Sequence, residues 1–258
     1  MKKIAIIWFP GINCENECLA ACDATGLSAE IIKSNTADIS PYSGYIIPGG
    51  WSYEDRIRAG VIASKQEVIT GLRKAADEGK PILGICNGCQ ILAESAIVPG
   101  FKKTSEIALA PNINPMVSGY YCSWIRVKCV SKKNVFNRYF SEGEVIEMPV
   151  AHGEGRFVTR DTKLIDTLSR NMQIAFTYCD GAGRECAFPF DPNGSMRHIA
   201  GITNQKGNVL ALMPHPERAL FEKQRPGKTM RSSEEAFSLT KASKIFKSMG
   251  DYIKNGYR

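Results

Sequence analysis

The chain has 258 residues and is 43% hydrophobic, enough to bury most of the surface that its unfolded form would expose. No apolar stretch approaches the roughly 18 residues of a membrane helix. The apolar run after Lys3 is broken by Pro10 and lacks a signal-peptide cleavage site. We therefore expect a cytoplasmic protein with no membrane partner. The formal charge is +7, but the Lys and Arg residues are scattered among Asp and Glu residues. The one dense basic stretch, 223–231, contains Pro and Gly. This pattern predicts a solvated loop and no nucleic-acid partner.

Strand patterns and helix patterns alternate through the first half of the chain. Four short apolar runs are typical of strands buried on both faces, and they span residues 3–9, 29–32, 45–48 and 81–85. We expect one helix to start near Asn13, which can cap it, and to end at Gly26, and a second to span 64–78. Strands that alternate with helices predict βαβ units and a mainly parallel sheet.

After Pro99 the pattern changes to strand-like segments with short helical pieces between them. These segments span 120–130, 145–148, 174–178, 199–203 and 209–212. Ser232 and Glu235 have the spacing of a capping box and mark the expected start of the last helix. Because no linker-like block separates the two halves, we predict a single α/β domain over 1–258, with a central mostly parallel sheet, helices on both sides and an antiparallel extension. The active site is expected at the carboxyl ends of the strands.

The cysteines predict reduced thiols. We expect no disulfide framework from nine cysteines at irregular spacings without a secretory context. Cys14, Cys18 and Cys22 recur on one helical face, which invites a metal or cluster interpretation, but such stacking on one helix is more typical of core packing. We therefore predict no metal site. Neither a Walker pattern nor G-x-G-x-x-G occurs, so we expect no nucleotide bound by this chain.

The sharpest local signal is Gly84-Ile85-Cys86-Asn87-Gly88, where a strand gives way to a helix. This is the G-x-nucleophile-x-G elbow, in which flanking glycines permit a tight turn that lifts the central side chain clear of the sheet. A sulfur at a helix N-terminus sits at the positive end of the helix dipole, and the next backbone N–H can help to form an oxyanion hole. Cys86 is the predicted nucleophile.

Two other interpretations of Cys86 stay open. It could be a small buried residue at a strand end. It could also form a redox pair with Cys89, because the two make a C-x-x-C at a helix start. The flanking glycines favour the elbow, and we interpret Cys89 as a packed helix residue.

A cysteine nucleophile needs a base, and the chain has three histidines. His215 directly follows an apolar strand, where a sheet would deliver it to the same edge as Cys86, and Glu217 can hold its imidazole in the useful tautomer. His152 lies in a glycine-rich segment, which favours contact with a ligand or a structural role over general-base work. His198 follows Arg197 in a polar loop and is expected to be inert.

The segments GICNGCQ, 84–90, and PHPE, 214–217, resemble class I glutamine amidotransferases, and resembling blocks run through most of the chain. The resemblance implies that Cys86 attacks the glutamine side-chain amide, that His215 shuttles the proton and that Glu217 orients the imidazole.

The same resemblance implies how the substrate is held. A backbone N–H of Gly49 or Gly50 and the amide of Asn87 would hold the oxyanion, and Gln90 and His152 would help to bind glutamine.

Partners follow from the same resemblance. Ammonia would pass to a synthetase subunit that uses ATP and Mg, with a small accessory subunit in the complex, while this chain carries no cofactor of its own. Three alternatives remain: an elbow-cysteine hydrolase or deglycase acting on another small substrate, a thiol redox protein that uses Cys86 and Cys89, and an interaction subunit without turnover.

Overall fold

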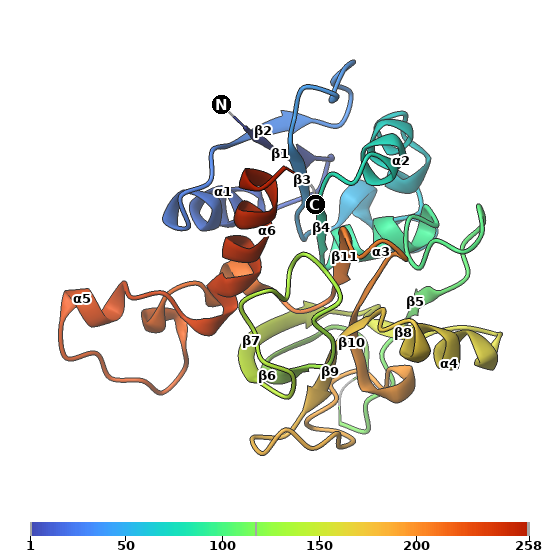
Figure 1. Ribbon diagram of the computed structural model, residues 1–258. Coiled ribbons are helices and arrows are strands. Elements are labelled where there is room, and N and C mark those ends of the chain that lie inside the picture. Colours follow the sequence, from blue (N-terminus) through green and yellow to red (C-terminus); the bar gives the residue numbers. More distant parts are fainter. Residues whose placement is uncertain (1, 117, 257–258) are drawn as a thin grey trace.

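One large sheet organises the protein, as a computed structural model describing residues 2–116 and 118–256 shows (Figure 1). Across this sheet the strands of the described chain are, in order, β2 (Ala29–Lys33), β1 (Ile4–Trp8), β3 (Gly44–Ile47), β4 (Ile82–Ile85), β11 (Val209–Leu212), β10 (Ile199–Thr203), β9 (Ile174–Cys179), β6 (Tyr121–Cys129) and β7 (Val145–His152). A two-stranded sheet pairs β5 (Ala108–Ala110) with β8 (Arg156–Val158).

The sheet has a parallel part and an antiparallel part. β2, β1, β3, β4 and β11 pair in parallel, whereas β10, β9, β6 and β7 continue the same sheet in antiparallel pairs. The predicted α/β fold with its antiparallel extension is therefore confirmed, and β11, from late in the chain, lies in the middle of the sheet between β4 and β10.

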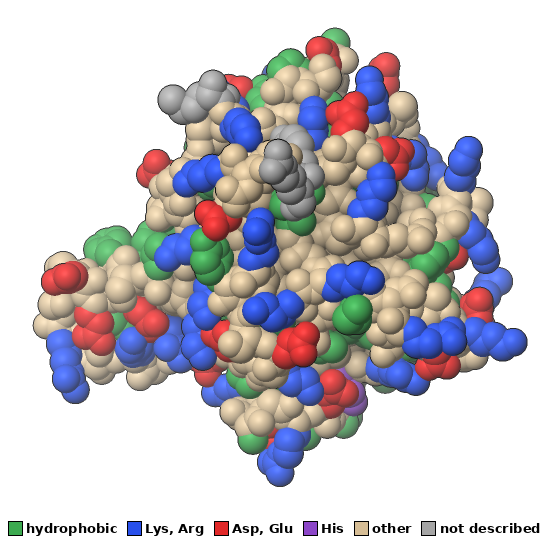
Figure 2. Space-filling view, viewed as in Figure 1, with side chains coloured by type: hydrophobic (Ala, Val, Ile, Leu, Met, Phe, Trp, Pro, Cys, Tyr) green, Lys and Arg blue, Asp and Glu red, His purple; other side chains and the backbone are tan. Residues whose placement is uncertain are grey.

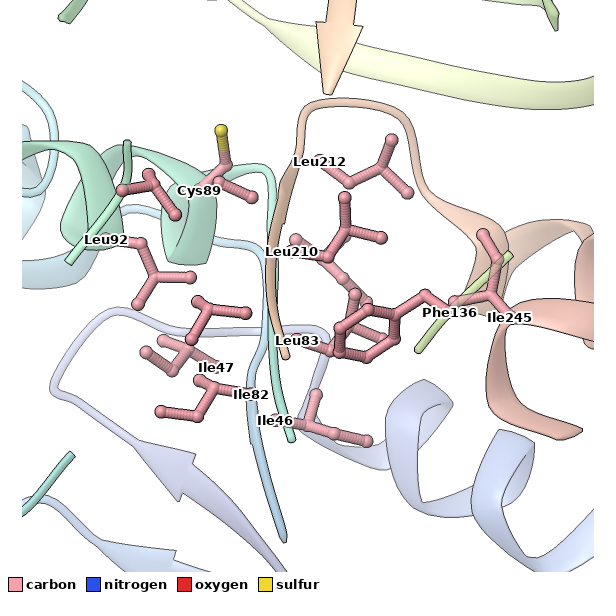
Figure 3. Close-up of a cluster of buried hydrophobic side chains, with 14 of the residues drawn as sticks. Ile46, Ile47, Ile82, Leu83, Cys89, Leu92, Phe136, Leu210, Leu212 and Ile245 are labelled. Carbon is pink, nitrogen blue, oxygen red and sulfur yellow. The ribbon is translucent and has the colours of Figure 1, made fainter. Parts of the chain in front are cut away.

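Helices cover both faces of the parallel part. In Figure 1, α1 (Glu15–Ala24) and α6 (Lys244–Lys254) lie on one side of these strands, and α2 (Val68–Asp77) and α3 (Asn87–Glu94) lie on the other. Successive side chains of a strand point to opposite faces: in β3, Ile46 lies on the side of α6 and Ile47 on the side of α3 (Figure 3). Both residues are fully buried, which explains why this strand reads as a continuous apolar run.

Two predicted helix starts are wrong. The helix expected over 64–78 is a 3-10 turn, Ala63–Lys65, followed by α2, because the extended backbone of Gln66 interrupts it. Asn13 does not cap α1. Cys14 holds the N-cap position, and its thiol donates to Asn13 Oδ1 instead.

The predicted last helix is in fact two helices. Ser232 does accept the backbone N–H of Glu235, but it caps the four-residue helix α5 (Ser233–Ala236). The chain then extends at Thr240, whose side chain accepts from the N–H of Ala242, before α6 begins. The remaining helix, α4 (Thr162–Arg170), lies beside the antiparallel part (Figure 1).

The surface is mixed in charge. Figure 2 shows Lys and Arg side chains spread over the visible face with acidic side chains between them. The basic stretch 223–231 is a largely exposed segment whose Arg225 pairs with Glu147 and whose Lys228 pairs with Glu222, in keeping with the predicted solvated loop. Within residues 2–116 and 118–256, none of the helices has the length and apolar character needed to cross a membrane.

Candidate active site

Cys86 sits at a sharp turn between β4 and α3. Its backbone is at φ 51° and ψ −105°, a region that is costly for any residue with a Cβ. The flanking glycines make the turn possible. A Cβ on Gly88 would lie 2.0 Å from the carbonyl oxygen of Ile47, and one on Gly84 would lie 2.6 Å from the carbonyl oxygen of Gly88. The elbow predicted from the sequence is therefore present in the structure.

The parallel pairing of β4 with β11 brings His215 to the elbow. Leu212 lies beside Ile85 in the register, and the N–H of Cys86 donates to the carbonyl oxygen of Leu212 at 2.8 Å. The chain then turns at Pro214, and the N–H of His215 donates to Pro149 at the edge of the antiparallel part at 2.9 Å. Residues more than 120 positions apart in sequence thus meet at one sheet edge.

His215 and Glu217 form a buried pair. The exposed fractions of the two side chains are 3% and 0%, and His215 Nδ1 lies 2.6 Å from Glu217 Oε1. Burial alone would lower the pKa of His215, but the carboxylate of Glu217 and the nearby sulfurs of Cys86 and Cys14 outweigh it and raise that pKa well above its ordinary value. The second ring nitrogen, Nε2, is buried and makes no hydrogen bond to the described residues.

Gly49 lies next to three side chains of the site. A Cβ at this position would lie 2.7 Å from His215 Cε1 and 3.3 Å from both Cys86 Cβ and Cys14 Sγ. The imidazole, the elbow cysteine and a second cysteine therefore surround one backbone position that has no side chain. Gly50 follows in an antiparallel bridge with Ile12, which fixes this segment against the start of the chain.

Two aromatic rings pack together near the elbow. The Tyr120 hydroxyl donates to the carbonyl oxygen of Ala151 at 2.8 Å, and Cys86 Sγ lies 3.6 Å from the same oxygen. The ring of Tyr120 is 5.8 Å from that of Trp51, and both side chains are partly exposed. Burial and the sulfur of Cys86 raise the pKa of Tyr120 to about 12, so its hydroxyl remains a neutral donor.

Asn87 and Gln90 belong to a buried polar network on α3. Asn87 Nδ2 donates to Gln90 Oε1 at 2.8 Å and to Asp55 Oδ1 at 3.0 Å. Gln90 Nε2 donates to the carbonyl oxygen of Glu154 at 2.7 Å. Burial and the nearby carboxylate of Glu154 raise the pKa of Asp55 to about 6. The network ties α3 to segments 52–55 and 152–155.

His152 is buried beside the site. Its Nδ1 lies 3.1 Å from Asn112 Oδ1, and its ring packs so closely against Gly155 that a Cβ there would come within 2.2 Å. Burial, together with the charge on His215, lowers the pKa of His152 to about 3. A neutral imidazole of this kind is a poor general base at neutral pH, which agrees with the sequence interpretation; its contact with a ligand remains a prediction.

Cys89 lies in the core, between Leu92 and the strands (Figure 3). Burial raises the pKa of its thiol well above the ordinary value. Both observations favour the packing interpretation over a redox pair with Cys86, because thiol exchange needs an accessible thiolate.

Three contributors to the site were not predicted from the sequence. Asp55 follows Gly49-Gly50 and Glu154 lies in the glycine-rich segment of His152, but neither carboxylate was assigned a role. Cys14 was interpreted as core packing together with Cys18 and Cys22; those two are fully buried in the core, whereas Cys14 Sγ accepts from Arg218 Nη2 at 3.3 Å and lies beside His215. Its position just after β1 was the available signal, because parallel strands end at one edge.

The fold and this cluster define a class: an α/β protein with a cysteine elbow at the carboxyl ends of parallel strands and a His–Glu pair beside it. The chain belongs to the CobB/CobQ-like glutamine amidotransferase family, whose sequence model matches residues 1–253. The resemblance predicted from GICNGCQ and PHPE is confirmed.

Individual relatives are similar over nearly the whole chain. Phosphoribosylformylglycinamidine synthase subunit PurQ of Methanothrix thermoacetophila is 45% identical over 98% of both chains. The protein of the same name from Pyrococcus horikoshii is 40% identical over 98% of this chain and all of its own. Among solved structures, PurLQS from Thermotoga maritima matches with a TM-score of 0.76 and 30% identity over 98% of this chain and 99% of that one.

Proposed function

We propose that this chain is the glutaminase subunit of a phosphoribosylformylglycinamidine synthase and that Cys86, His215 and Glu217 are its catalytic triad. The observation that carries the proposal is the elbow cysteine whose neighbour His215 is held by a buried carboxylate at 2.6 Å. Membership of a glutamine amidotransferase family and full-length similarity to PurQ proteins supply the substrate class.

Each residue of the triad has a defined step. His215 Nε2 takes the proton of the Cys86 thiol, and the sulfur attacks the side-chain carbonyl carbon of glutamine to form a tetrahedral intermediate. The same imidazole returns the proton to the departing nitrogen, so ammonia leaves and a glutamyl thioester remains. Water, deprotonated by His215, hydrolyses the thioester to glutamate and restores the thiol. Glu217 keeps Nδ1 protonated and so keeps Nε2 available.

The oxyanion is held by backbone donors. The N–H of Asn87 follows the nucleophile at the start of α3, and the segment Gly49-Gly50 passes beside Cys86. Donors of this kind stabilise the charge that develops on the carbonyl oxygen during attack. A side chain at Gly49 would fill the space next to the imidazole, so the glycine keeps the backbone within reach.

The buried network around α3 shapes the glutamine pocket. Asn87 and Gln90 are committed to Asp55, to each other and to the carbonyl of Glu154. We therefore place their contribution in holding segments 52–55 and 152–155 around the substrate, with the buried His152 at the start of the second segment.

The ammonia passes to a partner. In the proposed complex a synthetase subunit uses ATP and Mg to convert formylglycinamide ribonucleotide to the amidine, and a small accessory subunit completes the assembly. The relatives named PurQ and the structure named PurLQS support a multisubunit enzyme. The contacting rings of Trp51 and Tyr120 are partly exposed, so a docked partner can cover this side of the site, and we expect weak glutaminase activity from the chain alone.

The test compares glutamine with ammonia as nitrogen donor in the assembled enzyme. Cys86→Ala is expected to abolish glutamine-dependent amidine synthesis and to leave ammonia-dependent synthesis intact. Cys89→Ala is the matched control, one turn along α3, and is expected to keep both activities. Retained glutamine-dependent synthesis in Cys86→Ala would contradict the triad. Loss of it in Cys89→Ala, with the fold intact, would favour the redox alternative.

A chemical probe separates this function from that of a hydrolase or deglycase with the same elbow. Diazo-oxo-norleucine, a glutamine analogue, is expected to alkylate Cys86 rapidly, and glutamine is expected to protect it. Mass spectrometry of the labelled peptide reads out both effects. Slow labelling without protection by glutamine would show that the pocket does not recognise this amino acid.

A further inference from the structure

The side chain of Asn87 links the two halves of the proposed oxyanion site. Asn87 follows the nucleophile at the start of α3, is fully buried, and would offer its backbone N–H to the oxyanion. Its side-chain Oδ1 accepts the backbone N–H of Ser52 at 3.1 Å. Ser52 is also buried and lies two residues after Gly50. One amide group therefore connects the helix start to the glycine segment that would supply the second donor.

Asp55 fixes the direction in which this amide points. Asn87 Nδ2 donates to Asp55 Oδ1 at 3.0 Å and to Gln90 Oε1 at 2.8 Å. Burial and the nearby Glu154 raise the pKa of Asp55 to about 6, so its carboxyl is mainly ionised at neutral pH. An ionised carboxylate has no donor, unlike the amide of Gln90. It therefore admits only the orientation that turns Nδ2 toward itself and leaves Oδ1 facing the Ser52 N–H.

The turn that carries Asp55 has an unusual backbone conformation. Tyr53, Glu54 and Asp55 have φ values of 54°, 59° and 51°, a region in which residues with a Cβ persist only where other contacts hold them. The side chain of Glu54 is exposed and pairs with Arg56, whereas Asp55 is partly buried and bonds inward to Asn87. The Asp55–Asn87 bond is thus a contact that holds this turn against α3.

We propose that Asp55 is a positioning residue for glutamine hydrolysis: its carboxylate orients the Asn87 amide, which keeps the Asn87 backbone N–H and the Gly49-Gly50 segment in place around the oxyanion. The inference rests on the proposed function and adds to it a residue that acts through Asn87. Oxyanion donors act on charge that develops during attack and not on bound substrate. Loss of Asp55 should therefore lower kcat and leave KM for glutamine little changed.

The test measures kcat and KM for glutamine hydrolysis in the assembled enzyme. Asp55→Ala should lower kcat by about 10-fold or more, approaching the roughly 10²- to 10³-fold cost of losing one oxyanion donor. Asp55→Asn keeps an oxygen acceptor for Asn87 and should restore most of the rate. Glu54→Ala is the matched control, because it removes the adjacent exposed carboxylate at a similar positive φ, and it should behave like the unmodified chain.

A double-mutant cycle separates this role from a general effect on the fold. Asn87→Ala removes the side-chain amide but keeps the backbone N–H, and it should also lower kcat. Adding Asp55→Ala to Asn87→Ala should cause little further loss, because residues that act through one contact are not additive. Additive losses would mean that Asp55 does not act through Asn87.

Thermal unfolding shows which variants are folded. If Asp55→Ala does not fold, Asp55→Gly serves in its place, because glycine adopts the positive φ of this position without strain. An unchanged kcat in a folded Asp55 variant, or a rise in KM alone, would overturn the inference and leave the triad standing. Absence of glutamine hydrolysis by the unmodified assembled enzyme would contradict the proposed function and the inference together.

Discussion

His215 Nδ1 and Glu217 Oε1 lie 2.6 Å apart inside the protein, where His215 directly precedes the short 3-10 turn Pro216–Ala219 that carries Glu217. Pro214 and Pro216 restrict the backbone on either side of the histidine. The carboxylate therefore meets Nδ1 without any contribution from distant segments, and the sheet has only to deliver the turn to the elbow. This local pairing makes the base testable by a single substitution.

Glu217→Gln should lower kcat/KM for glutamine hydrolysis by about 10²- to 10⁴-fold, the cost of disturbing the group that orients a catalytic imidazole. The carboxylate raises the pKa of His215, so its removal should also move the pH limb assigned to this histidine to lower pH. The measurement is kcat/KM against pH in the assembled enzyme.

Glu222→Gln is a suitable control, because this carboxylate pairs with Arg225 and Lys228 and not with a histidine. An unchanged pH profile in Glu217→Gln would mean that the carboxylate does not act through the imidazole.

Gly49→Ala should reduce turnover. The new Cβ would come within 2.7 Å of His215 Cε1, so the ring must move away from the elbow, and displacements near 1 Å cost about 10²-fold in rate. Gly181→Ala is the control, because its nearest neighbour is Arg126 Nε at 4.0 Å. Glutaminase rates and thermal unfolding are compared for both variants. Full activity in Gly49→Ala would mean that catalysis does not require the His215 ring at the position seen in this structure.

Much of the site could be read from the sequence because its chemistry is encoded locally. The glycines at 84 and 88 define the elbow, and the interval from His215 to Glu217 defines the pair. Alternation of strands and helices then predicts that both lie at the carboxyl edge of a parallel sheet. The pairing of β4 with β11 brings the elbow and the His–Glu pair together. This pairing is a property of the whole sheet and cannot be predicted from either motif alone.

The parts that sequence could not supply depend on packing between distant segments. The sequence around Asp55 and Glu154 does not show that these two carboxylates come together, since their proximity arises only when the loops after β3 and β7 fold over α3. The 3-10 turn before α2 was hidden for a similar reason, because Gln66 has no breaker signal and leaves the helical conformation without a Gly or Pro. Cys14 was misplaced because its spacing to Cys18 outweighed its position after a strand.

Gly88→Ala should destabilise the fold strongly, by about 3 kcal/mol or more, because overpacking against backbone cannot be relieved by a rotamer change. The added Cβ would lie 2.0 Å from the Ile47 carbonyl oxygen, forcing α3 away from β3. Gly153→Ala is the control, since its nearest backbone atoms lie at 3.8 Å. Urea unfolding of both variants measures the difference, and similar midpoints would contradict the close helix–strand contact.

His152 should make the protein less stable in acid. Its pKa is about 3 in the folded chain, against about 6.5 when unfolded. Between these values the unfolded state binds the extra proton, so the free energy of unfolding falls as pH decreases from about 6.5 toward 3, by up to about 1.4 kcal/mol per pH unit from this residue. His152→Gln removes the titrating ring.

The measurement is urea unfolding of both chains at several pH values between 7.5 and 5. The variant should be less stable at neutral pH, because it loses the packing against Gly155 and the contact with Asn112. Its deficit should shrink as the pH falls, since only the unmodified chain has a buried imidazole that resists protonation. Other titrating groups are common to both proteins and cancel in the difference. A deficit that stays constant down to pH 5 would mean that the folded chain accepts the proton at His152 as readily as the unfolded one.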